Sequence, residues 1–268
     1  HRDLHSFPTR RSSDLAGATI GSSAAEVAAN CPLVITMLPN SPHVKTAVLG
    51  EKGVLEGAKA STILIDMSSI APQASQELEK ACATKGVRMI DAPVSGGEPK
   101  AIDGTLSIMV GGDKVVFEEV KVVLLKMGAS AVHCGTIGAG NTTKLANQII
   151  VAVNIAAVAE ALTLATKAGV DPALVFEAIK GGLAGSTVLN VKAPMMLDGN
   201  FKPGFKIDLH IKDLNNALET GHNIGAPLPL TATVQEMFSI LHADDCGQDD
   251  HSGLAKYYAK VSGTRIGK

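Results

Sequence analysis

The pattern of apolar and polar positions divides the chain into two parts. In the first part, short apolar runs rich in β-branched residues alternate with longer amphipathic stretches, which is typical of strands that alternate with helices. The predicted strands are 33–38, 62–66, 87–91, 106–110 and 131–134, and the predicted helices are 22–30, 42–49, 71–85 and 113–127. Apolar strands separated by helices favour a doubly wound parallel sheet covered on both faces. We therefore expect an α/β fold in this part.

The second part of the pattern contains helices only. Beyond residue 138 the strand pattern stops, and loops rich in Gly and Pro separate the apolar periods. The predicted helices are 141–168, 172–180, 207–223, 228–242 and 250–260. The longest of them, 141–168, is apolar on nearly every side, so it must be surrounded by protein. We expect it at a domain junction or a subunit interface.

Three segments follow from this pattern. Residues 1–15 have no initiator Met and no hydrophobic period, and Arg and Ser are crowded together there. We interpret them as a foreign segment that is disordered. Residues 16–137 are then expected to form the α/β domain, and residues 138–268 the all-helical domain.

Composition narrows the classes of partner. The 24 Lys and Arg residues against 26 Asp and Glu leave no positive excess for nucleic acid or an anionic membrane, so we expect a small-molecule partner. The longest uncharged apolar run, between Lys144 and Glu160, is shorter than the ~20 residues of a membrane span. The 4 cysteines show no C-x-x-C spacing, which argues against zinc and fits a reducing compartment. We therefore expect a cytoplasmic protein with no metal site.

Lys144 is the first candidate for chemistry, because it lies near the start of the long predicted helix. Asn147 and Gln148 follow it at i+3 and i+4, which places both amides beside the ammonium. The positive end of the helix and partial burial would both lower the pKa of this lysine, so that it can give up a proton. We expect Asn141 or Thr142 to cap the helix. Taken alone, Lys144 is more simply explained as an exposed lysine near a helix start, and the neighbouring candidates change this interpretation.

The ends of the predicted strands supply further candidates, since ligands of open α/β sheets bind where the strands end. Ser95-Gly96-Gly97 offers a hydroxyl and unhindered backbone N–H groups, which suit a carboxylate. By itself the same sequence also forms an ordinary turn. On the helix near 207, Lys212 could meet a cofactor or substrate across the cleft, while Asp213 could face water.

Three motifs in this order resemble the β-hydroxyacid dehydrogenase family. They are Asp91-Ala-Pro-Val-Ser-Gly-Gly97, Gly138-x-Gly-x-x-x-Lys144-x-x-Asn147 and Lys212-Asp-Leu214, and the resemblance runs from about Ala16 to near the carboxyl end. It implies a Rossmann domain that binds NAD or NADP, a long interdomain helix, and a helical domain that mediates homo-oligomerisation. It also implies the reduction of 2-hydroxy-3-oxopropanoate to glycerate with hydride from the nicotinamide cofactor.

The resemblance also implies roles for single residues. Lys144 is then the catalytic lysine and Asn147 supports it. The substrate is expected to bind Ser95, Gly96, Gly97 and Gln148, and the cofactor is expected to contact Leu38, Pro39, Ser69 and Lys212. Hydride addition to an aldehyde leaves an alkoxide, to which the ammonium of a lysine can supply a proton.

Two features depart from the family pattern. Gln148 stands where many members, including 3-hydroxyisobutyrate dehydrogenases, carry a second Asn, which favours the semialdehyde reductases. No G-x-G-x-x-G follows a first strand, so we expect an incomplete Rossmann domain in an amino-terminally truncated chain. Two alternatives stay open. One is a 3-hydroxyisobutyrate dehydrogenase or another short semialdehyde or glyoxylate reductase, and the other is an inactive helical oligomerisation scaffold.

Overall fold

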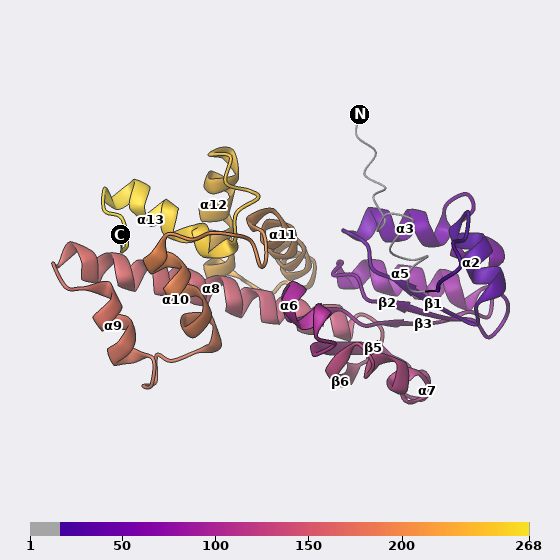
Figure 1. Ribbon diagram of the computed structural model, residues 1–268. Coiled ribbons are helices and arrows are strands. Elements are labelled where there is room, and N and C mark those ends of the chain that lie inside the picture. Colours follow the sequence, from indigo (N-terminus) through magenta and orange to yellow (C-terminus); the bar gives the residue numbers. More distant parts are fainter. Residues whose placement is uncertain (1–16, 268) are drawn as a thin grey trace.

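The protein is described by a computed structural model that covers residues 17–267. A part that contains the sheet and a part made of helices lie at opposite ends of an elongated molecule (Figure 1). One long helix, α8 (Ala139–Lys167), connects them. The predicted foreign segment 1–15 lies outside the described residues.

The sheet has six strands within this range, in the order β1-β2-β3-β5-β4, with β6 paired to β5. Their bounds are β1 Leu33–Thr36, β2 Ile63–Asp66, β3 Arg88–Asp91, β4 Val94–Ser95, β5 Leu106–Gly112 and β6 Gly128–Gly135. The five predicted strands are confirmed, and the two-residue β4 was not expected.

The sheet is mostly parallel, as predicted, and the antiparallel pairing of β5 with β3 and β4 was not expected. Strands β1, β2 and β3 are parallel, and β5 and β6 are parallel, whereas β5 is antiparallel to both β3 and β4. A parallel connection needs a crossover that returns the chain along the sheet. Between β3 and β5 lie only β4 and the short helix α6 (Gly97–Ile102), which do not make that return.

Side chains alternate between the two faces of the sheet, as strands require. Leu64 and Met89 pack with helices α2 (Ala24–Asn30), α3 (Ser41–Leu49), α4 (Val54–Gly57) and α5 (Pro72–Ala83). Ile65 and Ile90 point to the opposite face, where they pack with α7 (Lys114–Leu124). The helices predicted in this part are confirmed, and α4 and α6 are additional.

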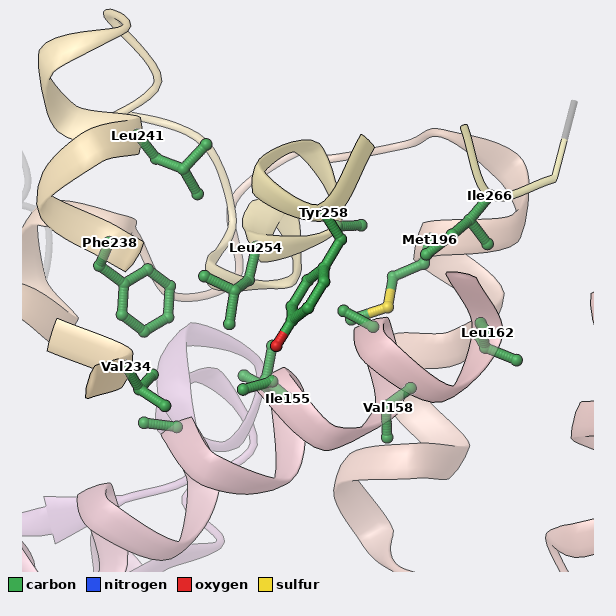
Figure 2. Packing of buried hydrophobic residues seen from close by; sticks show 14 of the residues in the cluster. Ile155, Val158, Leu162, Met196, Val234, Phe238, Leu241, Leu254, Tyr258 and Ile266 are labelled. Carbon is green, nitrogen blue, oxygen red and sulfur yellow. The ribbon is translucent and has the colours of Figure 1, made fainter. Parts of the chain in front are cut away.

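The helical part is built around the second half of α8. The other helices of this part are α9 Pro172–Ile179, α10 Thr187–Asp198, α11 Ile207–Ile224, α12 Pro229–Ala243, η1 His251–Gly253 and α13 Leu254–Ser262. Ile155 and Leu162 of α8 pack in one core with Phe238 and Tyr258 (Figure 2). By length and composition α8 could cross a membrane, but it is the central core helix of this part.

Helix α10, which contains Pro194, lies between the helices predicted at 172–180 and 207–223, where a loop was expected. A proline in a helix interior removes one hydrogen bond and is costly. The helix forms because Ser186 caps it by accepting the N–H of Leu189, and because Leu189 and Met196 are buried in the core. Packing therefore outweighs the local penalty.

Candidate active site

The amino terminus of α8 is held by a carboxylate from the sheet. Asp91 ends β3, and its Oδ1 accepts the N–H of Gly138 at 2.7 Å while its Oδ2 accepts the N–H of Asn141 at 2.7 Å. Asp91 is fully buried. Negative charge at a helix amino terminus is favourable, since it pairs with unsatisfied donors and with the helix dipole. The start of α8 is thus fixed to the end of β3.

The predicted caps of α8, Asn141 and Thr142, are wrong. The side chain of Asn141 accepts the N–H of Ile70 at 3.0 Å and donates to Ser75 Oγ at 3.0 Å, so it binds the loop after β2 and helix α5 instead. The Thr142 hydroxyl donates back to the carbonyl of Gly138 at 2.9 Å. Asp91 takes the capping role because it reaches two free N–H groups at once.

Lys144 lies in the second turn of α8 and is only 5% exposed. Its Nζ donates to Gln148 Oε1 at 2.9 Å. Asn147 Nδ2 donates to the same oxygen at 2.8 Å, so Asn147 reaches the lysine through Gln148 rather than directly. Gln148 Nε2 in turn donates to Asp213 Oδ2 at 2.7 Å. The i+4 neighbour expected beside the ammonium is therefore its hydrogen-bond partner.

Burial lowers the pKa of Lys144 to about 8, because an ammonium ion is poorly solvated inside protein. The carboxylate of Asp213 opposes this shift, and the ammonium of Lys212 adds to it. The predicted direction is confirmed, with burial as its main cause. Near neutral pH this group can both give and take a proton.

Lys212 and Asp213 of α11 lie near this group, and their side chains form an ion pair at 2.8 Å. Lys212 Nζ donates to the carbonyl of Ser69 at 2.7 Å and so joins the helical part to the loop after β2. Asp213 does not face water, as one of the expectations had it. It is only 1% exposed, because it packs against α8 and binds Gln148.

The Ser95-Gly96-Gly97 turn lies at the end of β4 and borders the same loop as Lys144. Gly96 and Gly97 are exposed and adopt φ of 139° and 67°, a conformation that glycine tolerates without strain. A Cβ on Gly97 would lie 3.4 Å from the carbonyl oxygen of Gly204. The next residue, Phe205, has its ring centroid 6.0 Å from Lys144 Nζ. The loop 204–205 thus connects the turn with the lysine.

The residues expected to contact a cofactor gather at one edge of the sheet. β1 and β2 are parallel and in register, with Thr36 opposite Asp66, so the segments that follow them emerge side by side. Leu38 donates its N–H to Ser68 Oγ at 2.8 Å, and Pro39 and Ser69 are at least partly exposed beside this contact. Lys212 reaches the edge through Ser69. Within residues 17–267, no group of three His, Cys, Asp or Glu side chains could hold a metal ion.

Phe205, His210 and the capping role of Asp91 were missed by sequence reasoning. For His210 a signal existed. It lies three residues before Asp213 on α11, on the face that carries Ile207 and Leu214. Polar residues on the apolar face of a helix indicate a buried hydrogen-bonded group. No comparable local signal exists for Asp91 or Phe205.

Comparisons with known proteins agree with this geometry. Residues 8–138 match the model for the NAD binding domain of 6-phosphogluconate dehydrogenase, and residues 138–258 match that for the NAD-binding domain of NADP-dependent 3-hydroxyisobutyrate dehydrogenase. The chain is 44% identical to 2-hydroxy-3-oxopropionate reductase of Escherichia coli over 240 residues, or 90% of this chain and 82% of that protein. The chain belongs to the β-hydroxyacid dehydrogenase family.

Other members of the β-hydroxyacid dehydrogenase family match over a similar length. The 3-hydroxyisobutyrate dehydrogenase of Pseudomonas aeruginosa is 37% identical over 245 residues, which cover 89% of this chain and 81% of that protein. The solved 3-hydroxyisobutyrate dehydrogenase of Mycobacterium tuberculosis has a TM-score of 0.85 at 31% identity, covering 93% of this chain and 88% of that one. The chain is thus an NAD(P)-dependent oxidoreductase with a Rossmann-type part and a helical part.

Proposed function

We propose that this enzyme reduces 2-hydroxy-3-oxopropanoate to glycerate with NADH or NADPH, and that Lys144 is its general acid. The observation that carries this proposal is the buried amine of Lys144, whose pKa is lowered to about 8 beside the loop that borders Ser95-Gly96-Gly97. The 44% identity to the Escherichia coli reductase of that name supports the choice of substrate.

The sheet-containing part and the helical part have different roles in the reaction. Residues 16–137 bind the cofactor and the substrate carboxylate, and residues 138–268 supply the catalytic lysine. The two family models meet at residue 138, which supports this division. Lys144 and the substrate turn come from different parts, so the reaction takes place between them.

The turn after β4 holds the substrate carboxylate. Consecutive glycines with positive φ direct backbone N–H groups toward one anion without side chains in the way. The Ser95 hydroxyl adds one further hydrogen bond. We assign Gln148, which is hydrogen-bonded to both Lys144 and Asp213, to the hydroxyl-bearing end of the substrate.

Lys144 moves the proton. When bound, NADH or NADPH supplies the hydride to the aldehyde carbon. The ammonium of Lys144 donates a proton to the oxygen on which negative charge develops. Gln148 Oε1 orients the ammonium, and the nearby Asp213 carboxylate favours its charged form. In the reverse direction the neutral amine takes the proton from the alcohol.

The cofactor is held at the edge formed by the loops after β1 and β2. Leu38 and Pro39 line one loop, Ser69 lines the other, and Lys212 closes over Ser69 from α11. Apolar side chains with one ammonium nearby suit a nicotinamide ring joined to a phosphate-bearing ribose. These residues do not distinguish NAD from NADP.

We infer that the enzyme is a cytoplasmic homo-oligomer. Leu164 and Leu230 of the helical part are 71% and 65% exposed and line one apolar pocket with Val153 and Val234, and exposed apolar surfaces of this kind mark association sites. All four cysteines are free, which fits a reducing compartment.

A substrate panel assayed with both cofactors tests the function. The panel contains 2-hydroxy-3-oxopropanoate, 3-hydroxyisobutyrate, succinic semialdehyde and glyoxylate. We expect the highest kcat/KM for 2-hydroxy-3-oxopropanoate, and preference for 3-hydroxyisobutyrate would favour the alternative dehydrogenase. No turnover of any substrate, together with no change of NADPH fluorescence on mixing, would favour the oligomerisation scaffold.

Lys144→Ala tests the acid role within the same assay. We expect turnover to fall roughly a hundredfold to ten-thousandfold, while the affinity for NADPH changes little. Lys167→Ala is the matched control, because Lys167 is an exposed lysine on the same helix. Equal turnover in the Lys144 variant and the parent would remove the acid role.

A further inference from the structure

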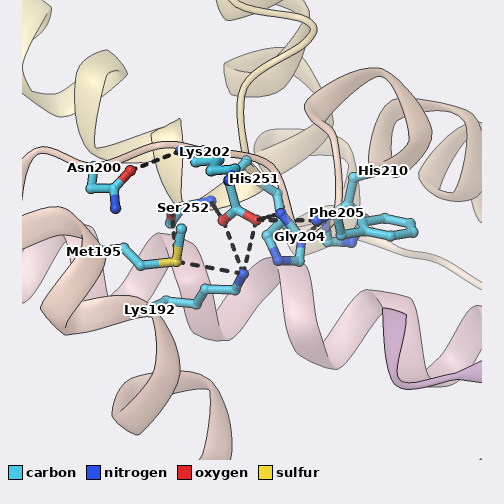
Figure 3. Close-up of polar contacts among 10 residues, drawn as sticks. Lys192, Met195, Asn200, Lys202, Gly204, Phe205, His210, His251 and Ser252 are labelled. Atoms are coloured by element: carbon cyan, nitrogen blue, oxygen red, sulfur yellow. Dashed lines mark hydrogen bonds and ion pairs between the residues drawn. The ribbon is translucent and has the colours of Figure 1, made fainter. Parts of the chain in front are cut away.

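Two buried histidines, His210 and His251, lie next to Gln148, the hydrogen-bond partner of Lys144. His210 of α11 is fully buried, and His251 of η1 is 5% exposed. Their Nδ1 atoms are 3.0 Å apart, and His210 Nε2 lies 3.1 Å from the carbonyl oxygen of Gln148 (Figure 3 shows the two rings beside Phe205). The mechanism above uses neither histidine.

The contacts assign one hydrogen-bonding pattern to the pair. A carbonyl oxygen only accepts, so Nε2 of His210 carries a hydrogen. Nδ1 of a neutral His210 is then an acceptor, and Nδ1 of His251 must donate to it. A proton added to Nδ1 of His210 would charge that ring and place two N–H groups opposite each other. A proton added to Nε2 of His251 would charge the other buried ring. With both rings neutral, the pattern makes them opposite tautomers, with the hydrogen on Nε2 of His210 and on Nδ1 of His251.

Burial, rather than the charges around the pair, favours neutrality, because carboxylates and ammonium groups oppose each other there. The pair faces two ammonium groups, Lys144 from α8 and Lys192 from α10, and two carboxylates, Asp213 from α11 and Asp250 before η1. Burial lowers the pKa of His210 to about 4 and lowers the pKa of His251 well below its usual value. Both rings are thus uncharged near neutral pH.

The chain of hydrogen bonds cannot conduct a proton to Lys144, because it ends on the backbone carbonyl of Gln148. It can fix positions. The backbone N–H of His251 donates to the carbonyl of Phe205 at 2.9 Å, and the two imidazole rings pack on the Phe205 ring, with centroids 5.6 Å away for His210 and 5.4 Å away for His251. The pair therefore joins Gln148, which binds the lysine, to Phe205, whose ring faces it.

The loop that carries Phe205 is fixed from its other side as well. Asp250 accepts the N–H groups of Gly204 and Phe205 at 3.0 and 3.1 Å and pairs with Lys192 at 2.9 Å. Since Asp250 immediately precedes His251, its carboxylate links the loop, η1 and α10 to one another. The histidines connect these elements to α8 through the contact of His210 with the carbonyl of Gln148.

We propose that the neutral His210–His251 pair is a positioning element that holds the Lys144 amine between Gln148 Oε1 and the Phe205 ring. The proposal rests on the function given to Lys144 above. It assigns to the pair no contact with substrate or cofactor. Its loss should disturb the amine through Gln148 and Phe205 while the cofactor edge, which lies against α11 at Lys212, is left intact.

The decisive comparison is His251→Leu with His251→Asn in the full chain. Leucine keeps bulk but removes the donor, whereas the amide of asparagine can replace the Nδ1–H. We expect His251→Leu to lower kcat roughly tenfold to a hundredfold with the KM for NADPH unchanged, since small misplacement of a catalytic group is costly. His251→Asn should recover most of that loss. His242→Leu, at an exposed histidine with a 63% exposed side chain, is the control and should keep parental kcat.

A measurement without turnover separates this proposal from the function itself. Nitrogen-15 NMR of the unsubstituted protein at pH 7 should give two neutral rings, His210 protonated at Nε2 and His251 at Nδ1. The pKa of Lys144, followed by NMR, should rise from about 8 toward the usual lysine value in His251→Leu, as water reaches the amine. A charged ring, the opposite tautomers, or an unmoved lysine pKa in His251→Leu would each overturn the proposal, and each can be measured even if no reductase activity is found.

Discussion

The Asp91 carboxylate accepts the backbone N–H of Asn141 at 2.7 Å and thereby ties the last residue of β3 to the first turn of the helix that carries Lys144. Its other oxygen accepts the N–H of Gly138. The close approach is possible because residue 140 is glycine, whose added Cβ would lie 2.4 Å from the carbonyl oxygen of Met109. The sheet therefore sets the position of the lysine through one buried side chain.

Asp91→Ala should lower the free energy of unfolding by about 3 kcal/mol or more, since it leaves two buried N–H groups without an acceptor. Asp113→Ala is the matched control. Asp113 is an exposed cap of α7 that accepts the N–H of Val115, and its loss should cost about 1 kcal/mol. Urea unfolding of the two variants measures both values. Equal losses would show that the Asp91 contacts are no stronger than an ordinary cap.

The pKa of Lys144 predicts opposite pH profiles for the two directions of the reaction. Burial lowers this pKa to about 8, so the ammonium needed for reduction is lost as the pH rises through 8. The neutral amine needed for oxidation is gained over the same range. We expect kcat/KM for aldehyde reduction to fall above pH 8 and kcat/KM for alcohol oxidation to rise up to it. If kcat/KM changes in the same direction for both reactions as the pH passes 8, the pH dependence belongs to a group other than Lys144.

Sequence reasoning located the elements whose signals are local. The apolar run at 62–66 predicted β2, and the glycines before Lys144 predicted the start of α8. The lowered pKa of Lys144 followed from its place near a helix start in an apolar segment, which the sequence displays. Motif order was enough to identify the family.

What was missed depends on contacts between distant residues. Asp91 and Gly138 are 47 positions apart, and His210 and His251 are 41 apart. A local pattern cannot show that such groups meet, nor that β5 runs against β3. The same holds for α10, where burial of Leu189 and Met196 overrides Pro194.

Asp66 provides a test of the balance between burial and charge in the sheet. Its Oδ1 accepts from Thr36 Oγ1 at 2.8 Å and from the N–H of Ser68 at 3.1 Å. Oδ2 is buried and has no hydrogen-bond partner among the described residues. Burial raises the pKa of Asp66 from 3.8 to about 6, outweighing these hydrogen bonds, with a small addition from the Asp91 charge. The folded state therefore disfavours the ionised form.

Asp66→Asn should stabilise the protein above pH 6 and not below pH 4. Because the folded pKa is raised, the parent loses stability as the pH rises from 3.8 through 6, and asparagine avoids this loss while keeping an acceptor for Thr36. At pH 8 we expect a gain on the order of 1–3 kcal/mol in urea unfolding. The control Asp198→Asn, at an exposed position, should show no such dependence on pH. The same change in unfolding free energy for Asp66→Asn at pH 4 and pH 8 would contradict the raised pKa.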